Sequence, residues 1–151
     1  MSPQEIIKQY LQEQHVMQLA TVRDGQPWCT SVYFILGDDG NLYWASIPSR
    51  RHSIEIGDDA RVAAAIAVKS EIDKKVAGIQ IEGTAKQIIT KQDIHPIAIK
   101  YADRFNRTAQ WVEDFSSGKT EHCLYVLCPT KYVLFDESNF PVDPVHEFKV
   151  I

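Results

Sequence analysis

Alternating apolar and polar residues, interrupted by glycine- and aspartate-rich turns, constrain the fold of this chain most strongly. Three such segments, His15 to Val22, Pro27 to Leu36 and Leu42 to Ile47, have the two-residue period of a β-strand. Asp24-Gly25 separates the first two, and the run from Gly37 to Asn41 separates the second and third. Because Asp-Gly favours tight hairpins, the three strands are predicted to form an antiparallel meander.

Further strands and helices are predicted along the rest of the chain. The Ala-rich strand at 61–68 is expected to be buried, and later strands are placed at 77–89, 121–127 and 132–135. Helices are predicted from Ser2 to about Gln14, over 50–57, from Thr90 with a break near Pro96, and over 109–115. Six or more strands with a few helices between them predict a mainly β fold with α decoration, arranged as a small antiparallel barrel.

Size and charge exclude several classes of protein. A length of 151 residues without an internal linker predicts a single domain over 1–151. The formal net charge of −4 argues against a nucleic-acid partner, because binding phosphates requires surplus Lys and Arg. The apolar run at 62–68 is far shorter than the ~20 residues of a membrane helix, so no membrane contact is expected. Three cysteines without CxxC spacing are typical of a reducing compartment, and we expect a cytoplasmic protein.

Common catalytic patterns are missing from the sequence. It contains no P-loop, no GxGxxG after a strand, no HExxH and no GxSxG. The five histidines are scattered without metal-ligand spacing, which gives no reason to expect a metal site. No nucleophile or acid–base pair stands out, so no catalytic side chain is assigned.

One segment, Ser46 to Ile54, concentrates groups that bind anions. It holds hydroxyl side chains, Arg50, Arg51, His52 and a helix start directly after a strand. Arginine matches phosphate geometry with paired hydrogen bonds of about 1.5–3 kcal/mol each, and helix N-termini present backbone N–H groups to the same kind of ligand. The alternative is a basic, solvated loop, which composition alone does not distinguish from an anion site.

A series of short strings resembles the FMN-binding split-barrel family, which includes pyridoxamine 5′-phosphate oxidase. In chain order they are Leu19–Val22 with Asp24–Pro27, Thr30–Phe34, Leu42–Ser46, Arg50–His52, Asp58–Ala63 and Gly78–Ala85. The resemblance covers about residues 15–90, and Trp28-Cys29 together with the chain length is most similar to a small bacterial subgroup. It implies a six- or seven-stranded antiparallel split β-barrel.

The resemblance also implies an FMN site and the residues that form it. Thr30, Ser31, Val32 and Tyr33 would lie along the isoalloxazine ring, mostly through backbone groups. Ser46 and Arg51 match positions on the FMN phosphate, with Arg50 and His52 on either side of Arg51, and Gln80 is a candidate for the polar edge of the ring. In such proteins two subunits form a homodimer with the flavin in the groove between them. A phosphate beside His52 would raise the pKa of that imidazole.

The implied function is that of an FMN-dependent oxidoreductase acting on a small substrate or a nicotinamide, with the flavin carrying the redox chemistry. The end of the chain, Val145 to Ile151, lacks the Trp, Arg and His pattern that holds pyridoxine in the oxidase, so pyridoxamine phosphate is not the expected substrate. The alternative is a non-catalytic binding or sensor module for FMN, deazaflavin or haem. Two further questions stay open from sequence. Tyr101, Phe105 and Trp111 either cover the ring or pack helices onto the barrel, and Arg104 and Arg107 either bind an anionic substrate or face solvent.

Overall fold

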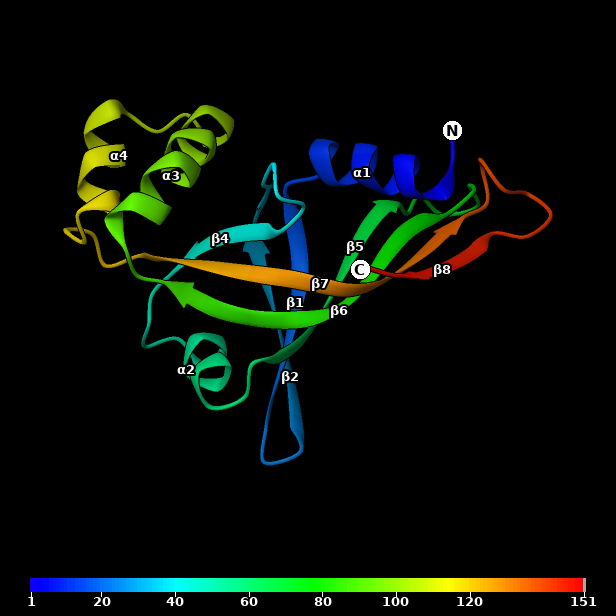
Figure 1. The fold of residues 1–151 in the computed structure, drawn as a ribbon. Coiled ribbons are helices and arrows are strands. Elements are labelled where there is room, and N and C mark those ends of the chain that lie inside the picture. Colours follow the sequence, from blue (N-terminus) through cyan, green and yellow to red (C-terminus); the bar gives the residue numbers. More distant parts are fainter. Residues whose placement is uncertain (151) are drawn as a thin grey trace.

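A strongly curled antiparallel sheet forms the body of the protein, and four helices lie around it (Figure 1). The computed structural model describes residues 1–150. Within them the strands are β1 (Val16–Arg23), β2 (Gln26–Tyr33), β3 (Ile35–Leu36), β4 (Leu42–Ser46), β5 (Arg61–Lys69), β6 (Ala77–Ile88), β7 (Cys123–Asp136) and β8 (Val145–Lys149). The helices are α1 (Pro3–Glu13), α2 (Arg51–Asp58), α3 (Lys91–Phe105) and α4 (Ala109–Ser116). This mainly β, split-barrel architecture confirms the predicted fold class.

The strand order explains how the sheet curls. Strands are hydrogen-bonded in the order β2-β1-β5-β6-β7-β4-β3, and β8 pairs with β7 beside this path. The predicted hairpin at Asp24-Gly25 is confirmed, since β1 and β2 pair from Val16↔Tyr33 to Arg23↔Gln26. Both turn residues have positive φ, 50° for Asp24 and 75° for Gly25, which is the backbone of a tight hairpin turn. Long β6 and β7 join the two halves of the sheet.

Helix α1 begins as its sequence predicts and closes one side of the barrel. The Ser2 Oγ accepts from the Glu5 N–H, and the Glu5 carboxylate accepts from the Ser2 N–H at 2.7 Å, which is a complete capping box. The buried face of α1 consists of Ile6, Ile7, Tyr10 and Leu11. These side chains join the barrel core, whose largest fully buried members include Trp44, Phe34 and Met17.

Replacing Tyr10 with Phe is expected to lower the free energy of unfolding by about 1–2 kcal/mol. The Tyr10 hydroxyl donates to Asp136 Oδ2 at 2.6 Å and accepts from Asn139 Nδ2, which fixes α1 to the end of β7. Burial and the neighbouring Asp136 carboxylate raise the pKa of Tyr10 to about 12, so the hydroxyl stays a donor. Urea unfolding measures the loss. Tyr33→Phe, at an exposed tyrosine, should change stability by less than about 0.5 kcal/mol, and an equal loss in both variants would contradict the prediction.

Several predicted boundaries are wrong. The segment at 27–36 is interrupted at Phe34, which is fully buried and whose N–H donates to the His15 carbonyl. The predicted three-stranded meander is therefore wrong, because β1–β2 and β3–β4 are separate hairpins at opposite ends of the strand order. The strands predicted at 121–127 and 132–135 are one strand, β7, because a register shift opposite Glu82 and Gly83 accommodates Pro129. Strand β8 was not predicted.

Helix α3 is also continuous through Pro96, where a break was predicted. The Thr90 side chain caps its N-terminus by accepting from the Asp93 N–H, and Ile94, Ala98, Tyr101 and Ala102 are buried along one face. Proline removes a single backbone hydrogen bond, and the packing of this face against the second apolar cluster maintains the helix.

Strand β5 is buried on one side only, which corrects the prediction of a buried strand. Val62, Ala64 and Ile66 face the core, whereas the alternate residues Ala63 and Ala65 are exposed. Within residues 1–150, no helix is long and apolar enough to cross a membrane.

Candidate functional site

A cleft of about 650 Å³ lies where β2, the end of β4, the start of α2 and the α3–α4 pair meet. Its volume falls within the ~300–1,000 Å³ typical of small-molecule sites. It is lined by Trp28, Thr30, Ser31, Val32, Tyr33, Ala45, Ser46, Ile47, Arg50, Arg51, His52, Tyr101, Arg107, Trp111 and His122. The structure therefore brings together every predicted site residue except Gln80.

Strand β2 forms one wall of this cleft. It is the terminal strand of the sheet path and pairs with β1 on one side, so backbone groups on its other edge are open for binding. The Ser31 hydroxyl donates to Gln18 Oε1 at 2.6 Å, so its side chain is already engaged with β1. A ligand along residues 30–33 would therefore meet mainly backbone groups, which agrees with the role that the resemblance implies.

The first turn of α2 presents backbone donors to the cleft. Arg50 is the N-cap residue, with extended backbone angles, and its side chain makes no capping hydrogen bond. The first N–H groups of a helix lack intrahelical acceptors, and they carry the positive end of the helix dipole. Arg51 and His52 follow directly, so side-chain and backbone donors share one corner of the cleft.

Arg51 is held in place by two neighbours. Its Nε donates to Glu55 Oε2 at 2.8 Å, and its guanidinium lies 4.0 Å over the Trp28 ring. Glu55 is fully buried and its other oxygen lies 3.4 Å from Thr21 Oγ1. Within residues 1–150 the Arg51 Nη atoms make no side-chain hydrogen bond or ion pair, so this arrangement leaves donors available for an anion.

His52 is buried against the end of β4. Its Nε2 lies 2.6 Å from the Ser46 Oγ, so the two predicted anion-binding side chains form a hydrogen-bonded pair. Burial lowers the pKa of His52, Arg50 lowers it further, and Glu55 opposes the shift. This direction is opposite to the raised pKa of His52 expected beside a phosphate, because in the free chain burial and the Arg50 cation together outweigh the Glu55 carboxylate.

Charge in the cleft has one sign. Three arginines line it, and no Asp or Glu does so within residues 1–150. The buried Glu55 lies behind Arg51 and is already bonded to it. In a protein with a net charge of −4, this local excess of cations points to an anionic ligand.

Comparison with known proteins agrees with this geometry. The pyridoxamine 5′-phosphate oxidase family matches residues 3–132. The chain belongs to this family. A UPF0306 protein of Photorhabdus laumondii is 27% identical over 90 residues, which span 59% of this chain and 63% of that relative. A UPF0306 protein of Klebsiella pneumoniae is 24% identical over 100 residues, or 66% of this chain and 67% of the relative.

Solved structures share the fold at low identity. The conserved hypothetical protein Rv2991 from Mycobacterium tuberculosis superposes with a TM-score of 0.78 at 18% identity, covering 100% of this chain and 92% of its own. The FAD-binding protein from Mesorhizobium loti superposes with a TM-score of 0.63 at 19% identity, covering 87% of this chain and 92% of its own. HutZ, the heme storage protein from Vibrio cholerae, superposes with a TM-score of 0.67 at 18% identity, covering 85% of this chain and 91% of its own. The family typically binds a flavin, and some proteins of this fold bind haem.

Gln80 lies apart from the cleft that holds the other candidate residues. It is exposed on β6 and lines a separate hollow of about 540 Å³ with Ala20, Cys29, Ala63 and Ala65. One chain therefore does not bring Gln80 to the cleft, and its role at the ring edge stays a prediction.

Seven cleft residues were not assigned to the FMN site from sequence: Trp28, Ala45, Ile47, Tyr101, Arg107, Trp111 and His122. For Tyr101, Trp111 and Arg107, the sequence left a role in the site as one of two alternatives. Tyr101 and Trp111 do both. They line the cleft, and their rings stack with centroids 5.5 Å apart in the apolar cluster formed by α3 and α4. Arg107 also lines it, whereas Arg104 donates to the Glu13 carbonyl at 2.8 Å and ties α3 to the end of α1. The α3–α4 hairpin is distant in sequence from β2, so no local pattern reveals this contact.

Proposed function

We propose that the chain binds FMN in this cleft and acts as a flavin-dependent oxidoreductase. The convergence of Arg50, Arg51, His52, Ser46 and residues 30–33 on one cleft without acidic side chains carries the proposal. These residues come from three elements, so a solvated basic loop does not account for their meeting.

The residues present fit a phosphorylated flavin. The uncapped start of α2, the free Arg51 donors and the Ser46–His52 pair would hold the phosphate. The open edge of β2 would hydrogen-bond the ring through backbone groups. Trp111 and Tyr101 supply apolar surface on the opposite wall.

A bound flavin would supply hydride and electron transfer. The side chains of the cleft bind and orient, and none of them has to remove a proton from the substrate. The substrate would be a small molecule or a nicotinamide.

An absorption spectrum of the purified protein, taken before and after FMN is added and the excess removed, tests the binding. Two retained flavin bands support the proposal, and their bleaching by NADH or NADPH without oxygen supports the redox role. Failure to retain flavin would contradict it.

Haem storage is the second candidate function. The solved structure of HutZ has this fold, and two histidines, His52 and His122, line the cleft. The same spectrum separates the candidates, because added haemin would give an intense Soret band shifted from free haemin. Replacing His122 with Ala would remove that shift if His122 is the axial ligand.

FMN affinity is expected to fall as pH rises through the pKa of His52 in the complex. Protonated His52 favours a bound phosphate, so binding raises the pKa of His52 above its lowered value in the free chain. The gain in FMN affinity is complete below the His52 pKa of the free chain and is lost as pH rises through the His52 pKa of the complex. Flavin fluorescence titrations from about pH 5 to 9 measure this dependence. The phosphate itself titrates near pH ~6, and a His52→Gln variant reports that contribution alone. Identical profiles for both proteins would contradict the prediction.

We also propose a homodimer with flavin at the interface. Exposed small side chains on β5, Ala63 and Ala65, would allow close approach of a second backbone, and Gln80 lies on the same face. Ala65→Arg is expected to yield a monomer in size-exclusion chromatography with light scattering, with at least tenfold weaker FMN binding. Gln9→Arg, on the exposed side of α1, is the matched control. A dimeric Ala65→Arg protein would overturn this interface.

A further inference from the structure

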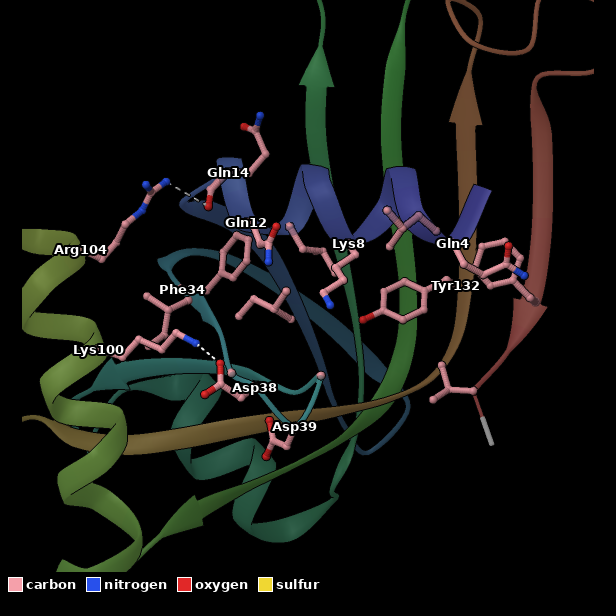
Figure 2. A pocket seen from close by; sticks show the side chains of 18 of the residues that line it. Gln4, Lys8, Gln12, Gln14, Phe34, Asp38, Asp39, Lys100, Arg104 and Tyr132 are labelled. Atoms are coloured by element: carbon pink, nitrogen blue, oxygen red, sulfur yellow. Dashed lines mark hydrogen bonds and ion pairs between the residues drawn. The ribbon is translucent and has the colours of Figure 1, made fainter. Parts of the chain in front are cut away.

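A second cavity, which is open to solvent, lies beside α1 and shares no lining residue with the FMN cleft. It has a volume of about 880 Å³ and is bounded by α1, the β3–β4 turn, α3, the second half of β7 and the end of β8 (Figure 2). The proposed flavin site gives it no role.

The cavity is long and its wall is largely apolar. It follows α1 from Gln4 to Gln14, ten residues of helix, which is a length of about 15 Å. Hydrocarbon surface comes from α1, the β2–β3 junction and β8, through Ile7, Leu11, Phe34, Leu36 and Phe148. An extended chain suits this shape better than a flat ring system.

One mostly buried side chain directs a hydrogen-bond donor into this space. Tyr132 is only 8% exposed, and its hydroxyl has no hydrogen-bond partner within residues 1–150. Figure 2 shows the hydroxyl directed into the cavity. Burial raises the pKa of Tyr132 to about 12, so the hydroxyl remains a donor. The hydroxyl is therefore a free donor on the cavity surface, and a ligand oxygen can accept a hydrogen bond from it.

The net charge of the cavity lining is positive, because four cations (Lys8, Lys100, Arg104 and Lys149) stand against two carboxylates (Asp38 and Asp39). Lys8 and Lys149 make no ion pair within the described chain, and Figure 2 shows Lys8 pointing inward. Both carboxylates of the lining are already engaged. Asp38 pairs with Lys100 at 2.5 Å, and Asp39 accepts from the Tyr43 hydroxyl at 2.6 Å.

From these observations we propose that the cavity binds a fatty-acid anion. The hydrocarbon chain lies along α1, and the carboxylate accepts hydrogen bonds from the Lys8 Nζ and the Tyr132 hydroxyl. The site complements such a ligand in apolarity and in charge.

The proposal is tested by calorimetric titration of the protein, saturated with FMN, with laurate and with myristate below their critical micelle concentrations. Each buried methylene should increase affinity about fourfold, so myristate, which has two more methylenes, is expected to bind about fifteenfold more tightly than laurate. Tetradecyltrimethylammonium, with the same chain and the opposite charge, should bind at least tenfold more weakly than myristate. 1-Naphthoate, a flat aromatic carboxylate, should also bind more weakly.

Two conservative variants locate the site. Lys8→Gln and Tyr132→Phe should each weaken myristate binding by about tenfold, because each removes a hydrogen bond to a charged group. Lys86→Gln, at an exposed lysine on β6 outside the cavity, is the control and should bind myristate unchanged. All three should retain FMN as the unmodified chain does, which separates this proposal from that of the flavin site.

Equal affinity for laurate and myristate, equal binding of the cationic amphiphile, or unchanged binding in both variants would each overturn the assignment. Tighter binding of 1-naphthoate than of myristate would overturn the assignment of an extended hydrocarbon chain to this cavity.

Discussion

Replacing Arg51 with Ala is expected to weaken FMN binding by one to two orders of magnitude. The buried Glu55 carboxylate and the Trp28 ring fix the guanidinium, so little side-chain freedom is lost when its remaining donors bind a phosphate. A charge-assisted hydrogen bond of about 1.5–3 kcal/mol corresponds to this loss. Quenching of flavin fluorescence gives the dissociation constant directly.

Two comparisons make the result specific. Arg51→Lys keeps the charge but loses the planar guanidinium and its Nε contact with Glu55. Its FMN affinity should therefore lie between those of the unmodified chain and Arg51→Ala. Arg61→Ala removes an exposed arginine that is paired with Asp59 outside the cleft, and it should leave FMN affinity unchanged. Normal FMN binding by Arg51→Ala would remove Arg51 from the phosphate site.

Replacing Gly83 with Ala is expected to lower the free energy of unfolding by about 2–3 kcal/mol. Gly83 lies at the register shift between β6 and β7, opposite Pro129. A Cβ there would overlap the Cys128 carbonyl oxygen and lie 3.1 Å from its carbon. Because these are backbone atoms of a central strand, the clash requires movement of the ladder itself. The thermal midpoint should fall by about 5–10 °C.

Gly57→Ala is the matched control for this substitution. Gly57 is an exposed residue of α2, and a Cβ there would meet no atom within 4 Å. Alanine in a helix is favoured over glycine, so this variant should be more stable by about 0.5–1 kcal/mol. If Gly83→Ala were as stable as the unmodified chain, the register shift between β6 and β7 would have to accommodate the added methyl group, which would contradict the prediction.

Local patterns predicted the elements that depend on neighbouring residues. The Ser2–Glu5 capping box and the Asp24-Gly25 hairpin involve groups at most a few residues apart, and both are as expected. The split barrel and most of the cleft followed from a resemblance spread over several short strings, and from the anion-binding composition of the Ser46–Ile54 segment.

Predictions were wrong where distant packing overrides local preference. Pro96 stays inside α3 because one helix face is buried. Pro129 stays inside β7 because β6 has a glycine at the matching position. Strand β8 is short and forms only by pairing with β7, so its own sequence carried little signal.

The sequence by itself determined the caps, the hairpins, the alternation of buried residues and the stock of anion-binding side chains, because these follow from backbone preferences and from chemistry along the chain. Only the tertiary structure decided which of them meet. It brought Arg107 and Trp111 beside β2, placed Glu55 behind Arg51, and left the Tyr132 hydroxyl facing an apolar cavity under α1. Such contacts join residues far apart in the chain, and they are set by the way the curled sheet and its helices bury their apolar faces.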